Sequence, residues 1–210
     1  MSFDEPGTVH VVDDDEHLRT ALVRLLRVSG YEVVAYPSAG AVLDAAPGGH
    51  GCLLLDLHLP DLSGLELQQE LAQRNVTMPV VFLTGRGDIR ASVHAMQAGA
   101  EDFLTKPVVE SELLAAIERA LARDRAQRAE AGRIEELRAR YATLSSPERN
   151  VMTYVISGHL NKQIAYRFGR AERTIKAHRA RVMEKMEAES TADLVRMAGL
   201  LGIPVQPPDA

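Results

Sequence analysis

The feature that most constrains the fold is an alternation of short aliphatic runs with helical patterns through the first 121 residues. Five runs have the length and aliphatic content of buried strands: 9–12, 32–36, 52–56, 79–84 and 102–105. Between the first two runs, apolar residues recur at helical spacing at Leu18, Ala21, Leu22, Leu25 and Leu26. Strands alternating with helices predict an α/β doubly wound fold, a five-stranded parallel sheet with both faces covered.

Length and composition place the chain among ordinary globular proteins. Its 210 residues allow one large domain or two small ones, and 46% hydrophobic with 25% charged residues argues against disorder and fibrous repeats. Cys52 is the only cysteine, which excludes an internal disulfide and a cysteine-based metal cluster. The sequence has no apolar run of membrane-spanning length and nothing like a secretory signal at MSFDEPGTVH. We therefore expect a cytoplasmic protein.

The net charge of −5 is distributed unevenly between the two halves of the chain. Residues 1–121 hold 8 Lys and Arg against 18 Asp and Glu, a net charge of −10, whereas residues 145–210 hold 10 against 7, a net charge of +3. Within 162–185 there are 8 basic residues and 2 acidic ones. This asymmetry favours two domains with different partners, the basic one suited to a polyanion.

A linker is predicted between these halves, over residues 122–143. Residues 123–133 are charged or small and form no apolar stripe, so this part is expected to be solvated. Apolar residues then resume at Ile134, Leu137, Tyr141 and Leu144, which predicts a helix that packs weakly. The composition permits either one rigid helix or a hinge.

The last region, 144–210, is predicted to be a small all-α domain of four helices with a loose, Pro-rich tail. Ser145 and Glu148 fit a capping box for the first helix, and Asn161 is expected to cap the second. Gly169 allows a tight turn before a third helix over 172–186, and a fourth begins near Ser190. Two short helices joined by a Gly-containing turn predict a helix-turn-helix.

Acidic residues follow the predicted strands of the first half. Asp13 and Asp14 close the first strand and Asp56 closes the third, so a parallel sheet brings three carboxylates together at one edge. Three negative carboxylates repel one another unless a hard cation binds between them. Mg²⁺ suits an open site of oxygen ligands. Thr84 and Lys106 close two further strands and add a hydroxyl and a cation to the same edge.

The sequence at this point resembles a family. Residues 9–121 resemble the receiver domain of two-component response regulators through VVDDD, LLLDLHLPDLSG, VVFLTG and DFLTKP, in that order. Residues 144–199 resemble the LuxR-type DNA-binding domain of the NarL/FixJ branch through LSSPERNV, GHLNKQIAYRFG and RTIKAHRARVMEKM. The segment TGRGDIRASVHAMQAGAEDFLTKP is most similar to FixJ-type regulators. The resemblance implies a flavodoxin-like receiver domain over 1–121 and a DNA-binding domain over 144–210.

The resemblance implies roles in the receiver domain. Asp56 corresponds to the phosphoacceptor, and Mg²⁺ would be bound by Asp13, Asp14, Asp56 and the main-chain carbonyl of His58. Thr84 and Lys106 correspond to the conserved hydroxyl and lysine, and Phe103 to an aromatic switch residue. Asp15, one residue beyond the acidic pair, is expected to cap a helix.

In the second domain, residues 172–186 correspond to the recognition helix. At 100° per residue, Ile175, His178, Val182 and Met186 form its inner face, while the small side chains of the outer face permit entry into a major groove. The family places Lys176, Ala177 and Ala180 at base-facing positions. The predicted DNA-binding residues are Lys162, Arg173, Thr174, Lys176, Ala177, Arg179, Ala180 and Arg181. Ala171 stands where a capping Ser or Thr is common, so the helix is expected to lack a side-chain cap.

The implied function is a transcriptional regulator controlled by phosphorylation rather than an enzyme. A sensor histidine kinase, promoter DNA and RNA polymerase are the implied partners, and phosphorylation would favour a homodimer through a surface that includes Arg90, His94, Gln97 and Asp102. Two alternatives stay open on the sequence. The receiver could be a constitutive or partner-controlled dimerisation module that is not phosphorylated, or Asp56 could be the nucleophile of a phosphatase. A common phosphatase pattern has an acid two residues after the nucleophile, where this chain has His58.

Overall fold

The computed structural model describes residues 7–85 and 100–205, and the chain divides into two compact units between Arg128 and Ala129. The first unit contains a sheet with all neighbouring strands parallel, in the order β2-β1-β3-β4-β5. Its strands are β1 Thr8–Val12, β2 Glu32–Tyr36, β3 Gly51–Asp56, β4 Val80–Thr84 and β5 Asp102–Thr105. This confirms the predicted five-stranded parallel sheet.

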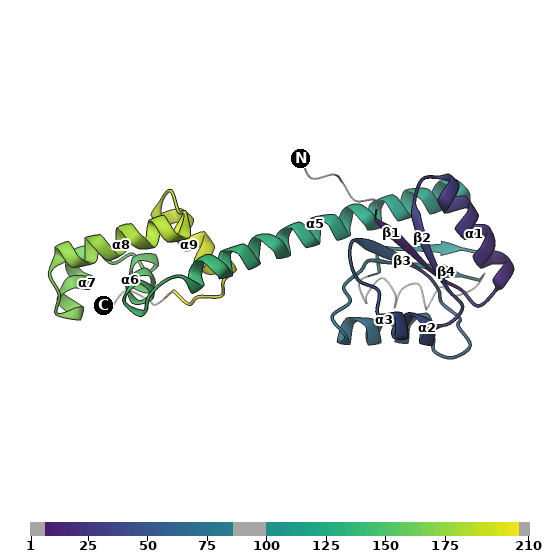
Figure 1. The fold of residues 1–210 in the computed structure, drawn as a ribbon, viewed down its shortest axis with the longest axis horizontal. Coiled ribbons are helices and arrows are strands. Elements are labelled where there is room, and N and C mark those ends of the chain that lie inside the picture. Colours follow the sequence, from purple (N-terminus) through teal and green to yellow (C-terminus); the bar gives the residue numbers. More distant parts are fainter. Residues whose placement is uncertain (1–6, 86–99, 206–210) are drawn as a thin grey trace. The chain divides into compact units, whose positions relative to one another are not determined.

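Helices cover both faces of the sheet (Figure 1). Helices α1 (Glu16–Val28) and the first part of α5 (Glu110–Ala142) lie on one face, where Leu22, Leu26 and Ile117 pack against Val11 and Leu54. Helices α2 (Ala39–Ala45) and α3 (Gly64–Gln73) lie on the other, where Leu67 and Leu71 pack against Leu55 and Phe82. The central strands β3 and β4 are buried along their whole length, which explains why they form unbroken aliphatic runs.

Helix α5 is one helix of 33 residues that contains almost all of the predicted linker. The expectation that residues 123–133 are solvated is wrong at Asp124, which is 1% exposed. Its carboxylate accepts hydrogen bonds from His50 and from the main chain of Gly51, so this turn belongs to the first unit. Near the other end of α5, Leu137 is buried in the core of the second unit, a firmer packing than the heptad-like spacing suggested.

The second unit is helical, as predicted. Its helices are α6 Ser146–Ile156, α7 Asn161–Phe168, α8 Glu172–Met186 and α9 Thr191–Leu200. Their apolar faces share one core that includes Val151, Ile164, Ile175, Val182 and Leu194. Gly169 ends α7 at φ +58°, a left-handed conformation that suits glycine.

The caps of these helices agree with the sequence except at one position. Glu148 accepts a hydrogen bond from the main-chain N–H of Ser145 at 2.8 Å, and Ser190 accepts one from Asp193 at 3.1 Å. The prediction that Asn161 caps α7 is wrong, because Leu160 is the N-cap residue and Gln163 bonds its N–H at 2.7 Å. The side chain of Asn161 instead accepts a hydrogen bond from Arg179, at 3.3 Å.

Within the described ranges, no helix is both long enough and apolar enough to cross a membrane.

Candidate functional site

Three acidic side chains meet at the carboxyl ends of β1 and β3. Carboxylate oxygens of Asp13, Asp14 and Asp56 all lie within 4.8 Å of one another. The sheet register produces this cluster, since β1 pairs with β3 up to Val12 and Leu55, and both chains then continue into acidic residues. Asp13 is fully buried and Asp56 is 6% exposed, while Asp14 is exposed to solvent. The sequence therefore placed these three residues correctly.

Lys106, from the loop after β5, bridges two of the three carboxylates. Its Nζ donates to Asp13 Oδ2 and to Asp56 Oδ2, both at 2.8 Å. Burial lowers the pKa of Lys106, but its bonds and charge interactions with the two carboxylates outweigh burial and raise that pKa above its usual value. Burial raises the pKa of Asp13 although Lys106 opposes it, because one lysine shared by two carboxylates does not fully offset the desolvation.

The donor set of this cluster fits a hard divalent cation. Three carboxylates supply oxygen ligands only, and Asp14 leaves the site open to solvent, as a partly hydrated Mg²⁺ requires. The main-chain N–H of His58 donates to Asp56 Oδ1 at 3.2 Å. This bond holds the main chain at His58 close to the Asp56 carboxylate. His58 itself is exposed to solvent.

Two further predicted residues, Thr84 and Phe103, belong to the neighbouring strands β4 and β5. Thr84 ends β4 and is 1% exposed, and its Oγ1 donates to the carbonyl of Gly85 at 3.3 Å. Phe103, in β5, packs against the core on the α2 and α3 side, with its ring centroid 6.1 Å from that of Phe82. The two strands are paired, with Thr84 opposite Thr105 and Phe82 opposite Phe103.

Side chains that the sequence did not single out fix the loop after Asp56. Asp61 accepts hydrogen bonds from the main-chain N–H groups of Gly40 at 2.9 Å and Ala39 at 3.3 Å, which ties this loop to the start of α2. These bonds lower the pKa of Asp61. Gly64 is required because a Cβ there would lie 2.5 Å from the carbonyl oxygen of Asp56. The segment LPDLSG contains both residues, but only the fold shows what they contact.

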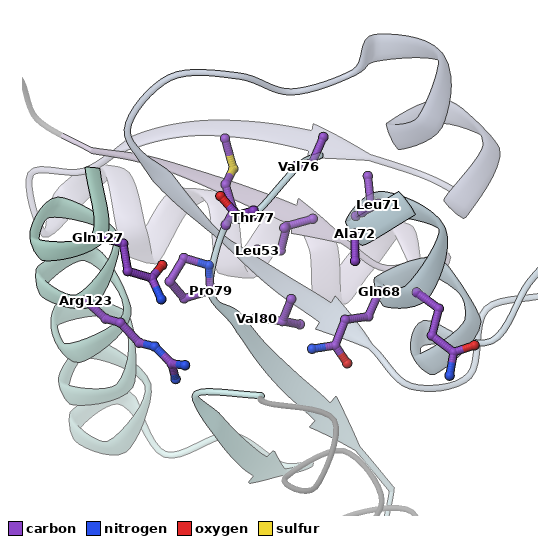
Figure 2. A pocket seen from close by; sticks show the side chains of 12 residues that line it. Leu53, Gln68, Leu71, Ala72, Val76, Thr77, Pro79, Val80, Arg123 and Gln127 are labelled. Atoms are coloured by element: carbon purple, nitrogen blue, oxygen red, sulfur yellow. The ribbon is translucent and has the colours of Figure 1, made fainter. Parts of the chain in front are cut away.

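A cavity of about 210 Å³ lies away from the acidic cluster, near the amino ends of β3 and β4 (Figure 2). Leu53, Pro79 and Val80 contribute apolar surface, and Gln127 extends toward it from α5. Arg123, also on its wall, pairs with Glu101 at 2.8 Å. Val80 begins β4 and Thr84 ends it, so this cavity is at the opposite end of the strand from the acidic cluster and forms no part of that site.

In the second unit, α8 presents a solvated outer face. Arg173, Lys176, Ala177 and Ala180 are all exposed, whereas Ile175, Val182 and Met186 are buried, as the helical spacing predicted. Lys176 pairs with Glu172 at 3.2 Å on this face. Ala171 precedes the helix without a side-chain cap, which confirms that expectation.

The residues that flank this outer face, most of which were predicted to contact DNA, differ in their surroundings. Lys162 and Arg181 are exposed, while Thr174 and His178 line a hollow between α6 and α8. Arg179 is part-buried and donates to Asn161 and, at 2.7 Å, to Thr191 Oγ1. Arg179 thus joins α8 to α7 and to the start of α9, a contact that its sequence position did not reveal.

The predicted dimer surface is described only in part. Arg90, His94 and Gln97 lie outside the described residues. Asp102 is described, and its carboxylate forms an ion pair with Arg119 of α5.

Comparison with known proteins agrees with this geometry. Residues 9–118 match the response regulator receiver domain, and residues 142–198 match the bacterial regulatory proteins of the luxR family. The chain is a response regulator of the NarL/FixJ family. A DNA-binding transcriptional regulator controlled by phosphorylation is the function that this pairing of domains supports.

Relatives of this response regulator match it over almost its whole length. Nodulation protein W of Bradyrhizobium diazoefficiens is 47% identical over 93% of this chain and 86% of that protein. The transcriptional regulatory protein FixJ of Azorhizobium caulinodans is 44% identical over 93% of each chain. Among solved structures, the response regulator StyR is 40% identical with a TM-score of 0.81, covering 92% of this chain and 98% of that one. Full-length FixJ from B. japonicum is 39% identical with a TM-score of 0.58, covering 94% and 98%.

Proposed function

We propose that Asp56 accepts a phosphoryl group from a sensor histidine kinase and that this event controls promoter binding. The observation that carries the proposal is the position of Lys106 Nζ, 2.8 Å from carboxylate oxygens of both Asp13 and Asp56. A carboxylate oxygen of Asp56 would form a bond to phosphorus as the bond from phosphorus to the donor histidine nitrogen breaks. Lys106 then lies where it can neutralise charge on the transferred group.

Asp13, Asp14, Asp56 and the carbonyl of His58 are the residues that would hold Mg²⁺ in this proposal. When bound, the cation neutralises phosphoryl oxygens and reduces the repulsion among the three carboxylates. Thr84 is proposed to bond a phosphoryl oxygen and, in moving toward it, to make room for the ring of Phe103. The position of both residues on adjacent paired strands supports this coupling.

The outer face of α8 is proposed to enter a major groove of promoter DNA. Lys176, Ala177 and Ala180 would face the bases, while Lys162, Arg173 and Arg181 would meet phosphates. The exposure of all six residues supports these assignments. Thr174 and Arg179 were also predicted to contact DNA, but the bonds of Arg179 inside the unit favour a positioning role for its guanidinium.

We further propose that phosphorylation favours a dimer whose two DNA-binding domains address paired half-sites. The proposed domain limits are 1–121 for the receiver, 122–143 for a helical linker and 144–210 for the DNA-binding domain. The surface around Arg90, His94, Gln97 and Asp102 is the proposed dimer contact, and RNA polymerase a further partner. Because promoter DNA is the target, we assign the protein to the cytoplasm. No metabolic activity is proposed beyond acceptance and slow loss of the phosphoryl group.

The test is the solution mass of the full chain by light scattering, with Mg²⁺ and with or without beryllium fluoride, a phosphoryl mimic. The wild type is expected to change from monomer to dimer with the mimic, and Asp56→Asn is expected to stay a monomer. Promoter binding measured on the same samples should rise only for the wild type. A dimer in all samples, with equally tight DNA binding, would instead support a constitutive dimerisation module.

A further inference from the structure

The loop from β1 to α1 carries two of the three clustered acids, and Arg19 holds its main chain. Arg19 lies in the first turn of α1, and its Nη1 donates to the carbonyl oxygen of Asp13 at 2.7 Å and to that of Asp14 at 3.3 Å. These bonds engage main-chain oxygens only. The carboxylates of Asp13 and Asp14 therefore stay available to the cluster.

The cluster needs a bend at this point of the chain. In an extended strand, successive side chains point to opposite faces and successive carbonyls point in opposite directions. Asp13 and Asp14 are adjacent, yet their carboxylate oxygens converge within 4.8 Å, and both of their carbonyl oxygens reach one guanidinium nitrogen. The bonds of Arg19 therefore lie at the bend where both carboxylates turn to the same side.

Asp15 contributes to the loop in a different way. Its carboxylate caps α1 by accepting from the N–H groups of His17 at 2.8 Å and Leu18 at 3.1 Å, and its own N–H donates to Asp13 Oδ1 at 2.9 Å. The first two bonds cap the start of the helix, and the third engages one carboxylate oxygen of Asp13. The contact of Arg19, in contrast, spans the main-chain carbonyls of both Asp13 and Asp14.

We propose that Arg19 is a positioning residue that sets the Mg²⁺ affinity of the acidic cluster by holding the Asp13 and Asp14 main chain in its bent form. This inference rests on the proposed phosphoacceptor function. Groups that orient metal ligands from outside the coordination shell commonly change metal affinity by about 10-fold to 100-fold when removed. The exposed position of Asp14 makes its orientation especially dependent on the main chain.

The experiment is calorimetric titration of the full chain with MgCl₂, in the absence of any phosphoryl donor. Arg19→Met is expected to weaken Mg²⁺ binding about 10-fold. Arg19→Lys, which keeps a donor but not the planar fork, should fall between Arg19→Met and the wild type. The matched control is Arg24→Met, the same change at an exposed position of α1, with binding expected to remain within about twofold of the wild type.

A second readout separates positioning from loss of structure. With acetyl phosphate as donor, the Mg²⁺ concentration for half-maximal phosphorylation of Arg19→Met should rise about 10-fold while the rate at saturating Mg²⁺ is largely kept. A merely structural role would lower the phosphorylated fraction and leave the half-saturating concentration unchanged. That pattern, or wild-type Mg²⁺ affinity in a folded Arg19→Met, overturns the proposal. If Arg19→Met does not fold, Arg19→Gln decides, because its shorter polar side chain keeps the helix surface polar but lacks the length to bond both carbonyls; wild-type affinity in a folded Arg19→Gln has the same meaning.

Asp13→Asn distinguishes failure of this inference from failure of the proposed function. If Asp13→Asn binds Mg²⁺ as tightly as the wild type, the metal site itself is wrongly assigned. If Asp13→Asn loses binding while Arg19→Met does not, the metal site stands and only the role of Arg19 is refuted.

Discussion

Asp124 and His50, which are 74 residues apart in sequence, are joined by a hydrogen bond of 2.7 Å from the imidazole Nδ1 to the carboxylate. The same Oδ2 accepts the N–H of Gly51 at 3.0 Å and Nε of Arg128 at 2.7 Å. Asp124 is 1% exposed, so α5 continues as part of the first unit beyond the point where the apolar stripe of the receiver ends. One buried carboxylate therefore connects the start of β3 to the predicted linker.

Replacement of Asp124 by Ala is expected to destabilise the first unit by about 2 to 3 kcal/mol, because it leaves the buried N–H of Gly51 and the ring of His50 without their acceptor. Hydrogen exchange of the full chain, resolved by peptide, should show faster exchange around residues 50–55 and unchanged exchange in residues 145–200. Glu130→Ala, at a much more exposed acid of the same helix, is the control. Unchanged protection of Gly51 in Asp124→Ala would contradict the prediction.

The ion pair of Glu148 and Lys185 predicts a dependence of stability on pH. Lys185, at 2.6 Å, and the N–H of Ser145 lower the pKa of Glu148 to about 2. A folded-state pKa below the unfolded value means that this contribution is fully present above about pH 4.5 and is lost as pH falls toward 2. Glu148→Gln should therefore lower the free energy of unfolding of the second unit by about 1 to 3 kcal/mol at pH 7 and by less at pH 3.

Calorimetric melting of the full chain at the two pH values measures this difference. Glu189→Gln, at an exposed residue, serves as the control and should show no such pH-dependent gap. An equal effect of Glu148→Gln at pH 7 and pH 3 would show that the carboxylate charge is not what stabilises the fold.

From the burial of Leu137 we expect that the second unit needs the end of α5 for its stability. Leu137 is 6% exposed and belongs to the core that α6, α8 and α9 form. Leu137→Ala should cost about 2 to 3 kcal/mol in the unfolding of that unit. A chain that begins at residue 130 should melt higher than one that begins at residue 145, which lacks this contact. Equal melting temperatures for the two chains would refute the prediction, and Glu136→Ala is the exposed control.

Lys176 and Arg181 are expected to affect DNA binding differently. Lys176→Met should weaken binding to the promoter by about 1 to 3 kcal/mol and relax the preference for one base. Arg181→Met should weaken binding to all DNA sequences alike. It should also reduce, by about 1, the slope of the logarithm of the binding constant against the logarithm of the salt concentration. Titration of phosphorylated protein against promoter and unrelated DNA at several salt concentrations measures both effects. Arg196→Met, on α9, is the control. A salt slope unchanged by Arg181→Met would rule out its phosphate contact.

The sequence predicted the acidic cluster well because the cluster depends on local patterns. Each strand end is marked by the change from aliphatic to acidic residues, and parallel pairing then brings the ends together, as at Val12 and Leu55. The helix boundaries of the second unit were likewise predicted, since capping residues such as Ser145 and Ser190 act within one turn.

Contacts between distant segments were not predicted. Arg19 was one of several charged residues of α1, and Asp61 was one acid within a loop, but the fold places the first on the carbonyls of the acidic pair and the second on the start of α2. Arg179 was predicted to contact phosphate from its place on a helical wheel, whereas packing directs it to Asn161 and Thr191. A helical wheel describes one helix and contains no information about its neighbours.

The sequence by itself determined the parallel sheet, the helical second unit and the three carboxylates. Hydrophobic periodicity and the change from aliphatic to acidic residues at a strand end are both local patterns that can be seen within a few residues. Only the tertiary structure decided that Asp124 is buried, that Arg19 holds the acidic loop and that Leu137 belongs to the second core. The physical reason is that burial and hydrogen bonding of these side chains depend on partners brought together by chain packing, and a polar residue in a charged segment looks the same in sequence whether or not packing covers it.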